Sequence, residues 1–177
     1  MENADRSGAL SLLTTLCPPP ANPALARATG RITVPTSHKA LVETYGTGCF
    51  DEFLWIFTEG ASSDQLDIAE RTRDLRDIWR GKQLSATHED LGELSFDADD
   101  LVQWGATDNA DLLVWISRGN PEEWPTAIIQ AGSLRAVVSP RSSTATILDV
   151  LTRATVVPFF PHDFPGDRPE FSTNPYG

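Results

Sequence analysis

The clearest pattern along the chain is a stretch with helical spacing that leads into an unbroken apolar run. Ser37 is a suitable N-cap residue, and Gly46 can adopt the left-handed conformation found just past a helix. One face of the helix between them would carry His38, Leu41, Val42 and Tyr45. Residues 53–57 (FLWIF) then show no alternation, which predicts a central strand covered on both faces. We therefore expect Trp55 to lie in the core.

A second helix is predicted by a capping motif and another apolar face. Ser62 and Gln65 have the spacing of a capping box. The apolar face that follows consists of Ile68, Thr72, Leu75 and Trp79. Opposite charges three or four residues apart predict ion pairs on the outer face, namely Asp67 with Arg71, Glu70 with Arg73, and Asp77 with Arg80. Gly81 would end this helix.

The second half of the chain contains short strand patterns separated by turn residues. The predicted strands are residues 94–96, 112–116, 126–129 and 134–138, and Trp104-Gly105 is assigned to a turn. Connections this short favour antiparallel neighbours. A last helix is expected at about residues 143–153. Together these elements predict an α+β fold, with a mainly antiparallel sheet and helices packed on one side.

Length and composition predict one domain without a membrane span. A chain of 177 residues is typical of one domain, and no apolar run approaches the roughly 18 residues that cross a bilayer. Residues 9–13 could be a signal-peptide core before Cys17, but an amphipathic segment fits the acidic flank better. We expect residues 1–30 to be an extension with a Pro-rich spacer and residues 31–157 to be the α+β domain. Residues 158–177, rich in Pro and Phe, would pack back on it.

The acidic residues are concentrated in one block. The net charge is −11, and residues 89–123 contain ten acidic residues against Arg118 alone, so this block carries −9. Such a surface repels nucleic acid and anionic membranes and attracts a basic protein. The predicted partner-binding residues are Asp97, Asp99, Asp100, Asp108, Asp111, Glu122 and Glu123. The alternative is that they form an ordinary solvated rim.

Motifs for catalysis or cofactor binding are not found. Asp97 to Asp100 resembles the start of a calcium loop, but Leu101 stands at its fifth position. His38 could be a catalytic base, although a packed, hydrogen-bonded core histidine is favoured. Cys17 and Cys49 have neither metal nor redox spacing, which predicts two ordinary thiols in a cytoplasmic protein. We therefore expect a chain that is not an enzyme and holds no cofactor or metal.

Two segments resemble the SUKH superfamily of Smi/Knr-like domains, which includes cell-wall assembly regulators. The first is residues 34–46 (VPTSHKALVETYG), where the family motif usually reads Leu-Pro-x-Asp-Tyr-Lys before a short helix ending in Tyr-Gly or Phe-Gly. The second is residues 104–125, from Trp104-Gly105 to Trp124-Pro125. Family members commonly have glycine where Ala110 stands, so that turn could differ here.

This resemblance covers roughly residues 34–151 and implies a non-enzymatic, protein-binding α+β domain. In bacteria such domains typically act as immunity proteins that neutralise polymorphic toxins, often nucleases. It therefore implies a chain that docks its acidic surface on a basic toxin domain. The alternative is a regulatory interaction module of the Smi/Knr type without a toxin partner. Genes beside this one would distinguish the two.

Overall fold

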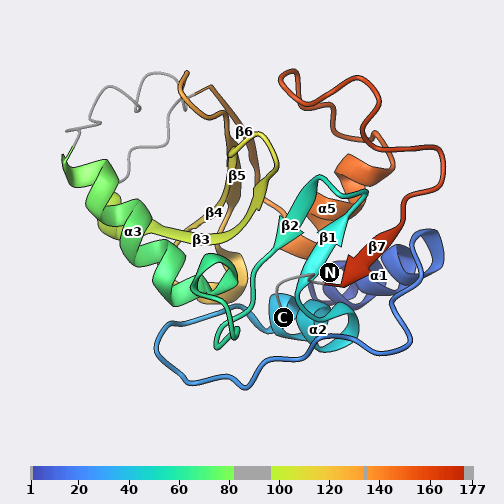
Figure 1. The fold of residues 1–177 in the computed structure, drawn as a ribbon, viewed down its shortest axis with the longest axis horizontal. Coiled ribbons are helices and arrows are strands. Elements are labelled where there is room, and N and C mark those ends of the chain that lie inside the picture. The colour runs from blue at the N-terminus through green and yellow to red at the C-terminus, as the bar shows by residue number, and fades with distance from the viewer. Residues whose placement is uncertain (1, 82–96, 134, 174–177) are drawn as a thin grey trace.

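Seven strands form one antiparallel sheet at the centre of the molecule (Figure 1). The computed structural model describes residues 2–81, 97–133 and 135–173. The strands are β1 (Gly48–Phe50), β2 (Leu54–Ile56), β3 (Leu101–Thr107), β4 (Leu112–Ile116), β5 (Thr126–Ile129), β6 (Ala136–Ser139) and β7 (Phe171–Thr173). Their order across the sheet is β6-β5-β4-β3-β2-β1-β7, and every neighbouring pair is antiparallel. The predicted α+β class and antiparallel sheet are confirmed.

The described helices cover both faces of this sheet. They are α1 (Glu2–Leu16), α2 (Thr36–Tyr45), α3 (Ile68–Gly81) and α5 (Ser143–Leu151). On one face, α1, α2 and α5 join a large apolar cluster that includes Trp104 and Trp115. On the other, Leu75 and Trp79 of α3 pack against alternate residues of β3, β4 and β5. The expected grouping of helices on one side therefore applies to α1, α2 and α5, while α3 lies opposite (Figure 1).

Both terminal segments contribute to the core. α1 packs along α5 and buries Ala9 and Leu13. At the other end β7 pairs with β1, which places Phe171 opposite Phe50 with 4.9 Å between the ring centroids. Phe164 likewise lies 4.6 Å from the ring of Phe53. The C-terminal segment thus extends the sheet by one strand and covers apolar rings.

Two helices begin at other residues than predicted. α2 starts at Thr36 and is preceded by Pro35, so Ser37 lies inside the helix and is not its N-cap. Residues 64–66 form a separate 3-10 turn, and α3 starts only at Ile68. Asp67 caps α3, because its Oδ1 accepts the backbone N–H of Glu70 at 2.9 Å. A carboxylate satisfies a free N–H and suits the positive end of the helix dipole.

The outer face of α3 largely follows the prediction. The apolar face Ile68, Thr72, Leu75 and Trp79 is buried. The ion pairs of Glu70 with Arg73, at 2.5 Å, and Asp77 with Arg80, at 3.3 Å, are present. Asp67, however, is buried and pairs with Arg31 at 3.1 Å. The expected pair of Asp67 with Arg71 is therefore wrong, which leaves Arg71 without that partner.

The longest strand, β3, lies where the sequence predicted a turn. All of its residues except Ala106 are buried, so it lacks the alternation that marks a half-exposed strand. Trp104 and Gly105 lie within it, at a bulge that shifts the register between Gln103 and Gly105. A Cβ at Gly105 would stand 2.5 Å from the Trp55 carbonyl oxygen, so only glycine fits there.

The other elements of the second half lie close to their predicted positions. β4 and β5 have the predicted bounds, and α5 ends at Leu151, two residues before the expected end. β6 starts at Ala136 rather than residue 134, which is itself not described. The strand expected at residues 94–96 lies outside the described residues.

Trp55 does not lie in the core. β2 comprises only three residues, and its neighbours Leu54 and Ile56 are buried, but the indole of Trp55 is partly exposed. α3 packs on β3, β4 and β5 and does not reach over β2. The expectation that residues 53–57 form a strand covered on both faces is therefore wrong. The uncovered face of β2 borders a pocket.

Candidate functional site

The seven carboxylates predicted to bind a partner lie in three separate turns. Residues 97–100 precede β3, residues 108–111 join β3 to β4, and residues 121–123 join β4 to β5. Because Leu101 pairs with Ile116, the first and third turns lie at one end of these strands and the second lies at the other. The sheet therefore brings only part of the predicted surface together. Glu89, Asp90 and Glu93 of the same acidic block lie outside the described residues.

The turn before β3 is largely neutralised by arginines. Asp100 forms an ion pair with Arg118 at 2.6 Å, and the hydrogen bond from Arg118 lowers the pKa of Asp100. Asp99 pairs with Arg80 of α3. Arg76 donates to the carbonyl oxygens of Asp99 at 2.8 Å and Leu101 at 2.9 Å. These contacts attach the turn to α3 and offset its charge.

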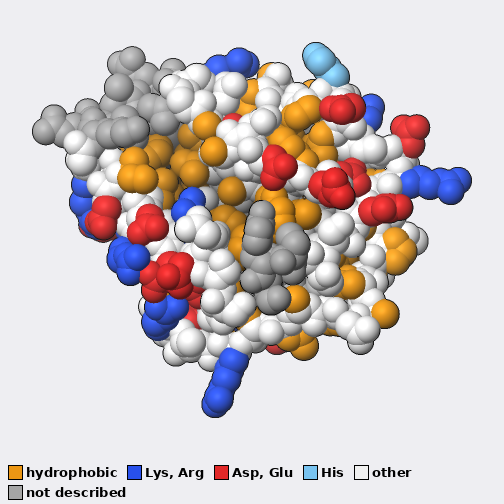
Figure 2. All heavy atoms as spheres, viewed as in Figure 1, with side chains coloured by type: hydrophobic (Ala, Val, Ile, Leu, Met, Phe, Trp, Pro, Cys, Tyr) orange, Lys and Arg blue, Asp and Glu red, His pale blue; other side chains and the backbone are white. Residues whose placement is uncertain are grey.

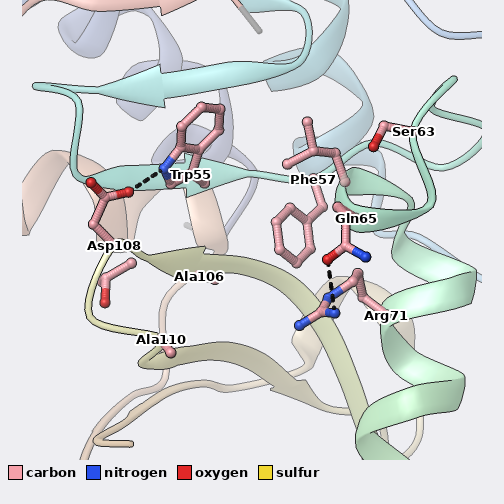
Figure 3. Close-up of a pocket in the computed structure, with 10 residues that line it drawn as sticks. Trp55, Phe57, Ser63, Gln65, Arg71, Ala106, Asp108 and Ala110 are labelled. Carbon is pink, nitrogen blue, oxygen red and sulfur yellow. Dashed lines mark hydrogen bonds between the residues drawn. The ribbon is translucent and has the colours of Figure 1, made fainter. Parts of the chain in front are cut away.

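The β3–β4 turn contains two aspartates with different environments. Asp108 is exposed, and its Oδ1 accepts the indole N–H of Trp55 at 2.8 Å (Figure 3). Asp111 is only 2% exposed. Its Oδ2 accepts the Thr107 hydroxyl at 2.8 Å, and its Oδ1 accepts the Ala131 N–H at 3.0 Å. The prediction that Asp111 belongs to the partner-binding surface is therefore wrong, because its carboxylate closes two turns inside the protein.

The β4–β5 connection also uses one of its acids internally. The Glu122 carboxylate accepts the backbone N–H of Thr36, the first residue of α2, at 2.5 Å. This places a negative charge at the positive end of a helix dipole. Among the residues that the structure describes, Asp97, Asp108 and Glu123 are the predicted acids that are exposed and form no ion pair.

A second set of carboxylates, which the sequence did not suggest, borders the C-terminal segment. Asp51, Glu52, Asp163 and Glu170 line a pocket of about 450 Å³, and Arg168 is its basic lining residue. We refer to these four acids as the acidic pocket. Figure 2 shows acidic side chains on this part of the surface. In the described parts of the chain none of the four forms an ion pair.

Asp51 holds the acidic pocket together. It lies in the tight β1–β2 turn with φ 49°, and its carboxylate accepts the N–H groups of Gly166 and Glu170, each at 2.8 Å. Its own N–H donates to the Glu170 carbonyl oxygen at 2.8 Å. Sequence reasoning missed this site because its two halves lie more than a hundred residues apart, and neither half is strongly acidic by itself.

Glu52 is the acid of the acidic pocket whose side chain has no structural role among the described contacts. Its φ is 52°, a conformation that turns of this kind usually assign to glycine or asparagine. A non-glycine residue in this region costs roughly 1–2 kcal/mol. Its side chain is exposed and accepts no hydrogen bond from the described residues. Strained residues of this kind concentrate at functional sites.

His38 is a packed core residue. It is completely buried between α2, α5 and β2, and the edges of its ring meet Trp104 and Trp115. Nε2 lies 2.9 Å from the Phe57 carbonyl oxygen and Nδ1 lies 2.9 Å from the Ser143 hydroxyl. A carbonyl only accepts, so Nε2 carries the proton and Nδ1 accepts from Ser143. Burial lowers the pKa of His38 to about 4, so the ring is neutral near pH 7.

The two cysteines are unpaired and buried. Burial raises the pKa of the Cys17 thiol and of the Cys49 thiol to about 11 in each case, so neither forms a reactive thiolate near pH 7. Within residues 2–81, 97–133 and 135–173, no group of three or more His, Cys, Asp and Glu side chains has the geometry of a metal site.

The same described ranges contain no helix with the length and apolar character that a membrane crossing requires. The resemblance of residues 34–46 and 104–125 to the SUKH superfamily stays a prediction, since no protein-family model, no curated protein and no solved structure matches the chain.

Proposed function

We propose that this chain is a cytoplasmic protein-binding domain of the immunity-protein type, which neutralises a basic toxin domain through the acidic pocket. The observation that carries the proposal is the position of Glu52, Asp163 and Glu170. Their carboxylates border one hollow, are not paired with described cations, and lie on backbone that Asp51 fixes. A nuclease binds phosphates through a basic cleft, so carboxylates held in this way could occupy that cleft in place of phosphates.

The electrostatics favour this surface over the acidic loops of the sheet. In the turn before β3, arginines from the same chain already neutralise Asp99 and Asp100, so those charges attract a partner only weakly. Charges without a local counter-ion speed the encounter with an oppositely charged partner, and salt screens them over about 8–10 Å. The interaction would therefore form quickly at low salt.

The toxin partner is tested by co-expression. The open reading frames beside this chain's gene are expressed in a bacterial host, each with and without this chain. One of them should stop growth when expressed alone, and this chain should restore growth. If no neighbouring product is toxic, or if the chain restores no growth, the immunity proposal fails. A neighbour that binds the chain but is harmless would favour a regulatory interaction module.

The position of the binding surface is tested with two variants of equal charge change. The first reverses Glu52, Asp163 and Glu170 to lysine, and Asp51 stays because it anchors the C-terminal segment. The matched control reverses Asp97, Asp108 and Glu123, the exposed acids of the sheet loops. The first variant should slow association with the partner at least tenfold and flatten its salt dependence, while the control should change it less. If the control instead slows association more than the first variant does, the binding surface would lie on the sheet loops.

A further inference from the structure

A pocket of about 490 Å³ lies where β2, β3 and the start of α3 meet (Figure 3). It exists because α3 covers β3 to β5 but leaves the outer face of β2 open. Trp55 lies opposite Ala106 in the register of β2 and β3, so a large ring stands beside a small side chain and leaves a hollow. Phe57 and Leu66 add apolar surface. The floor of this pocket is therefore aromatic and apolar.

One end of the pocket carries a cation with unused hydrogen-bonding capacity. Arg71 extends from α3 toward Gln65 and Phe57 (Figure 3). Its Nη1 lies 3.4 Å from Gln65 Oε1, which is a long contact. Its Nε is buried and has no hydrogen-bond partner among the described residues. Burial also keeps a ligand away from Nε, so the terminal nitrogens are the groups that can meet a ligand, and their hydrogen bond to the described residues is the long contact with Gln65.

Nearby carboxylates on α3 do not occupy this guanidinium. Asp67 is held by Arg31 at 3.1 Å, and Glu70 is held by Arg31 at 2.6 Å and by Arg73 at 2.5 Å. Arg31, which comes from the segment before α2, thus forms ion pairs with the two acids that lie within about one turn of Arg71. The positive charge of Arg71 is left to face the pocket.

The opposite end of the pocket is negatively charged, so it repels an anion and determines the orientation in which a ligand binds. Asp108 lies there and accepts the N–H of Trp55 at 2.8 Å, which also fixes the indole ring. A ligand with one carboxylate would therefore place it at Arg71 and its apolar part toward Trp55. A guanidinium binds a carboxylate through two parallel N–H bonds, and its two terminal nitrogens form such a fork.

From this geometry we propose that the pocket binds an aromatic carboxylate, with the carboxylate on Arg71 and the ring against Trp55 and Phe57. The ligand is either a free aromatic acid or an aromatic residue that ends a peptide chain. Both sources present the same chemistry. The site is separate from the acidic pocket, so it does not depend on the proposed toxin partner.

Nuclear magnetic resonance titration tests this proposal on the full-length protein. The probes are phenylacetate for a free acid and N-acetylphenylalanine for a peptide end, each compared with its neutral amide. The Nε–H signal of Arg71 and the indole N–H signal of Trp55 report the two ends of the pocket. A probe of about ten heavy atoms should bind with a Kd on the order of 1 mM. The acid whose titration of both signals gives the lower Kd identifies the source. The neutral amides should bind at least tenfold more weakly than the acids.

Three variants separate a specific site from general attraction. Arg71→Met keeps the unbranched apolar part of the side chain without the guanidinium and should abolish the shift at Trp55. Arg71→Lys keeps the charge without the planar fork and should bind with intermediate affinity. The matched control is Arg73→Met, two residues along α3 on the exposed face and paired with Glu70, which should bind like the unaltered protein. Equal binding of acids and amides, unchanged binding by Arg71→Met, or no binding of either acid would each overturn the proposal.

Discussion

Acidification should destabilise this protein through one buried residue, His38. The ring is completely buried and is neutral in the folded protein, with a pKa near 4 rather than the ordinary 6.5. Above pH 6.5 neither the folded nor the unfolded chain protonates it. Between pH 6.5 and pH 4 the unfolded chain takes up a proton that the folded chain refuses, so the free energy of unfolding falls as the pH falls. Below pH 4 both states are protonated and the loss stops.

The expected loss follows from the difference between the two pKa values. Each pKa unit corresponds to 1.36 kcal/mol, so a difference of about 2.5 units removes about 3 kcal/mol between pH 7 and pH 4. A domain of this size has about 5–15 kcal/mol of stability in total. Loss of this one contribution is therefore large enough to measure by denaturant unfolding at a series of pH values.

A variant isolates His38 from the carboxylates that titrate in the same range. His38→Phe keeps a ring in the site but leaves the Ser143 hydroxyl and the Phe57 carbonyl unsatisfied, so it should be less stable at pH 7 by about 1–3 kcal/mol. At pH 4 only the unaltered protein carries the penalty of about 3 kcal/mol, so the gap should close or change sign. A gap between His38→Phe and the unaltered protein that is the same at both pH values would refute the reasoning.

Five further substitutions test the backbone and packing described above. Ala110 has φ 64°, so Ala110→Gly should raise the free energy of unfolding by about 0.5–1 kcal/mol, whereas Ala131→Gly, at a position without positive φ, should lower it. Trp104→Ala should cost about 3–5 kcal/mol and Trp55→Ala about 1–2 kcal/mol, and equal losses in urea unfolding would contradict their different burial. Asp51→Ala should release the C-terminal segment, seen as faster limited proteolysis there while strands β1 to β6 stay folded.

Local patterns predicted the elements that are either periodic or uniformly apolar. The apolar face of α3 repeats with the period of a helix, whereas β4 and β5 are short apolar segments between turn residues. β3 was missed because Gln103 interrupts its apolar residues and because Trp104-Gly105 was assigned to a turn. The left-handed conformation of Ala110 could not be predicted from the sequence either, because an alanine does not indicate a positive φ. Such positions depend on neighbouring strands rather than on the residues themselves.

The exposure of Trp55 could not be read from its own segment either. Residues 53–57 are uniformly apolar. This pattern alone does not show whether a helix covers the outer face of β2. The outcome depends on where α3 lies, and α3 contacts β3 through Thr72, Leu75 and Trp79, which all come well after Trp55 in the chain. The pocket beside Trp55 is thus a consequence of helix placement, which sequence periodicity does not specify.

The carboxylates show most clearly why charge counts alone do not locate a site. Asp108 and Asp111 stand three residues apart in one turn, yet Asp108 is exposed and Asp111 is buried because the N–H of Ala131 reaches it from another turn. Within the acidic block that dominates the net charge, Asp99, Asp100 and Glu122 attach turns to helices, whereas Glu52 and Glu170 remain without counter-ions among the described residues. A carboxylate that the fold leaves unpaired is the one that can attract a basic partner. That property depends on three-dimensional neighbours, which is why the proposed binding surface lies at the β1–β2 turn rather than in the most acidic stretch of the sequence.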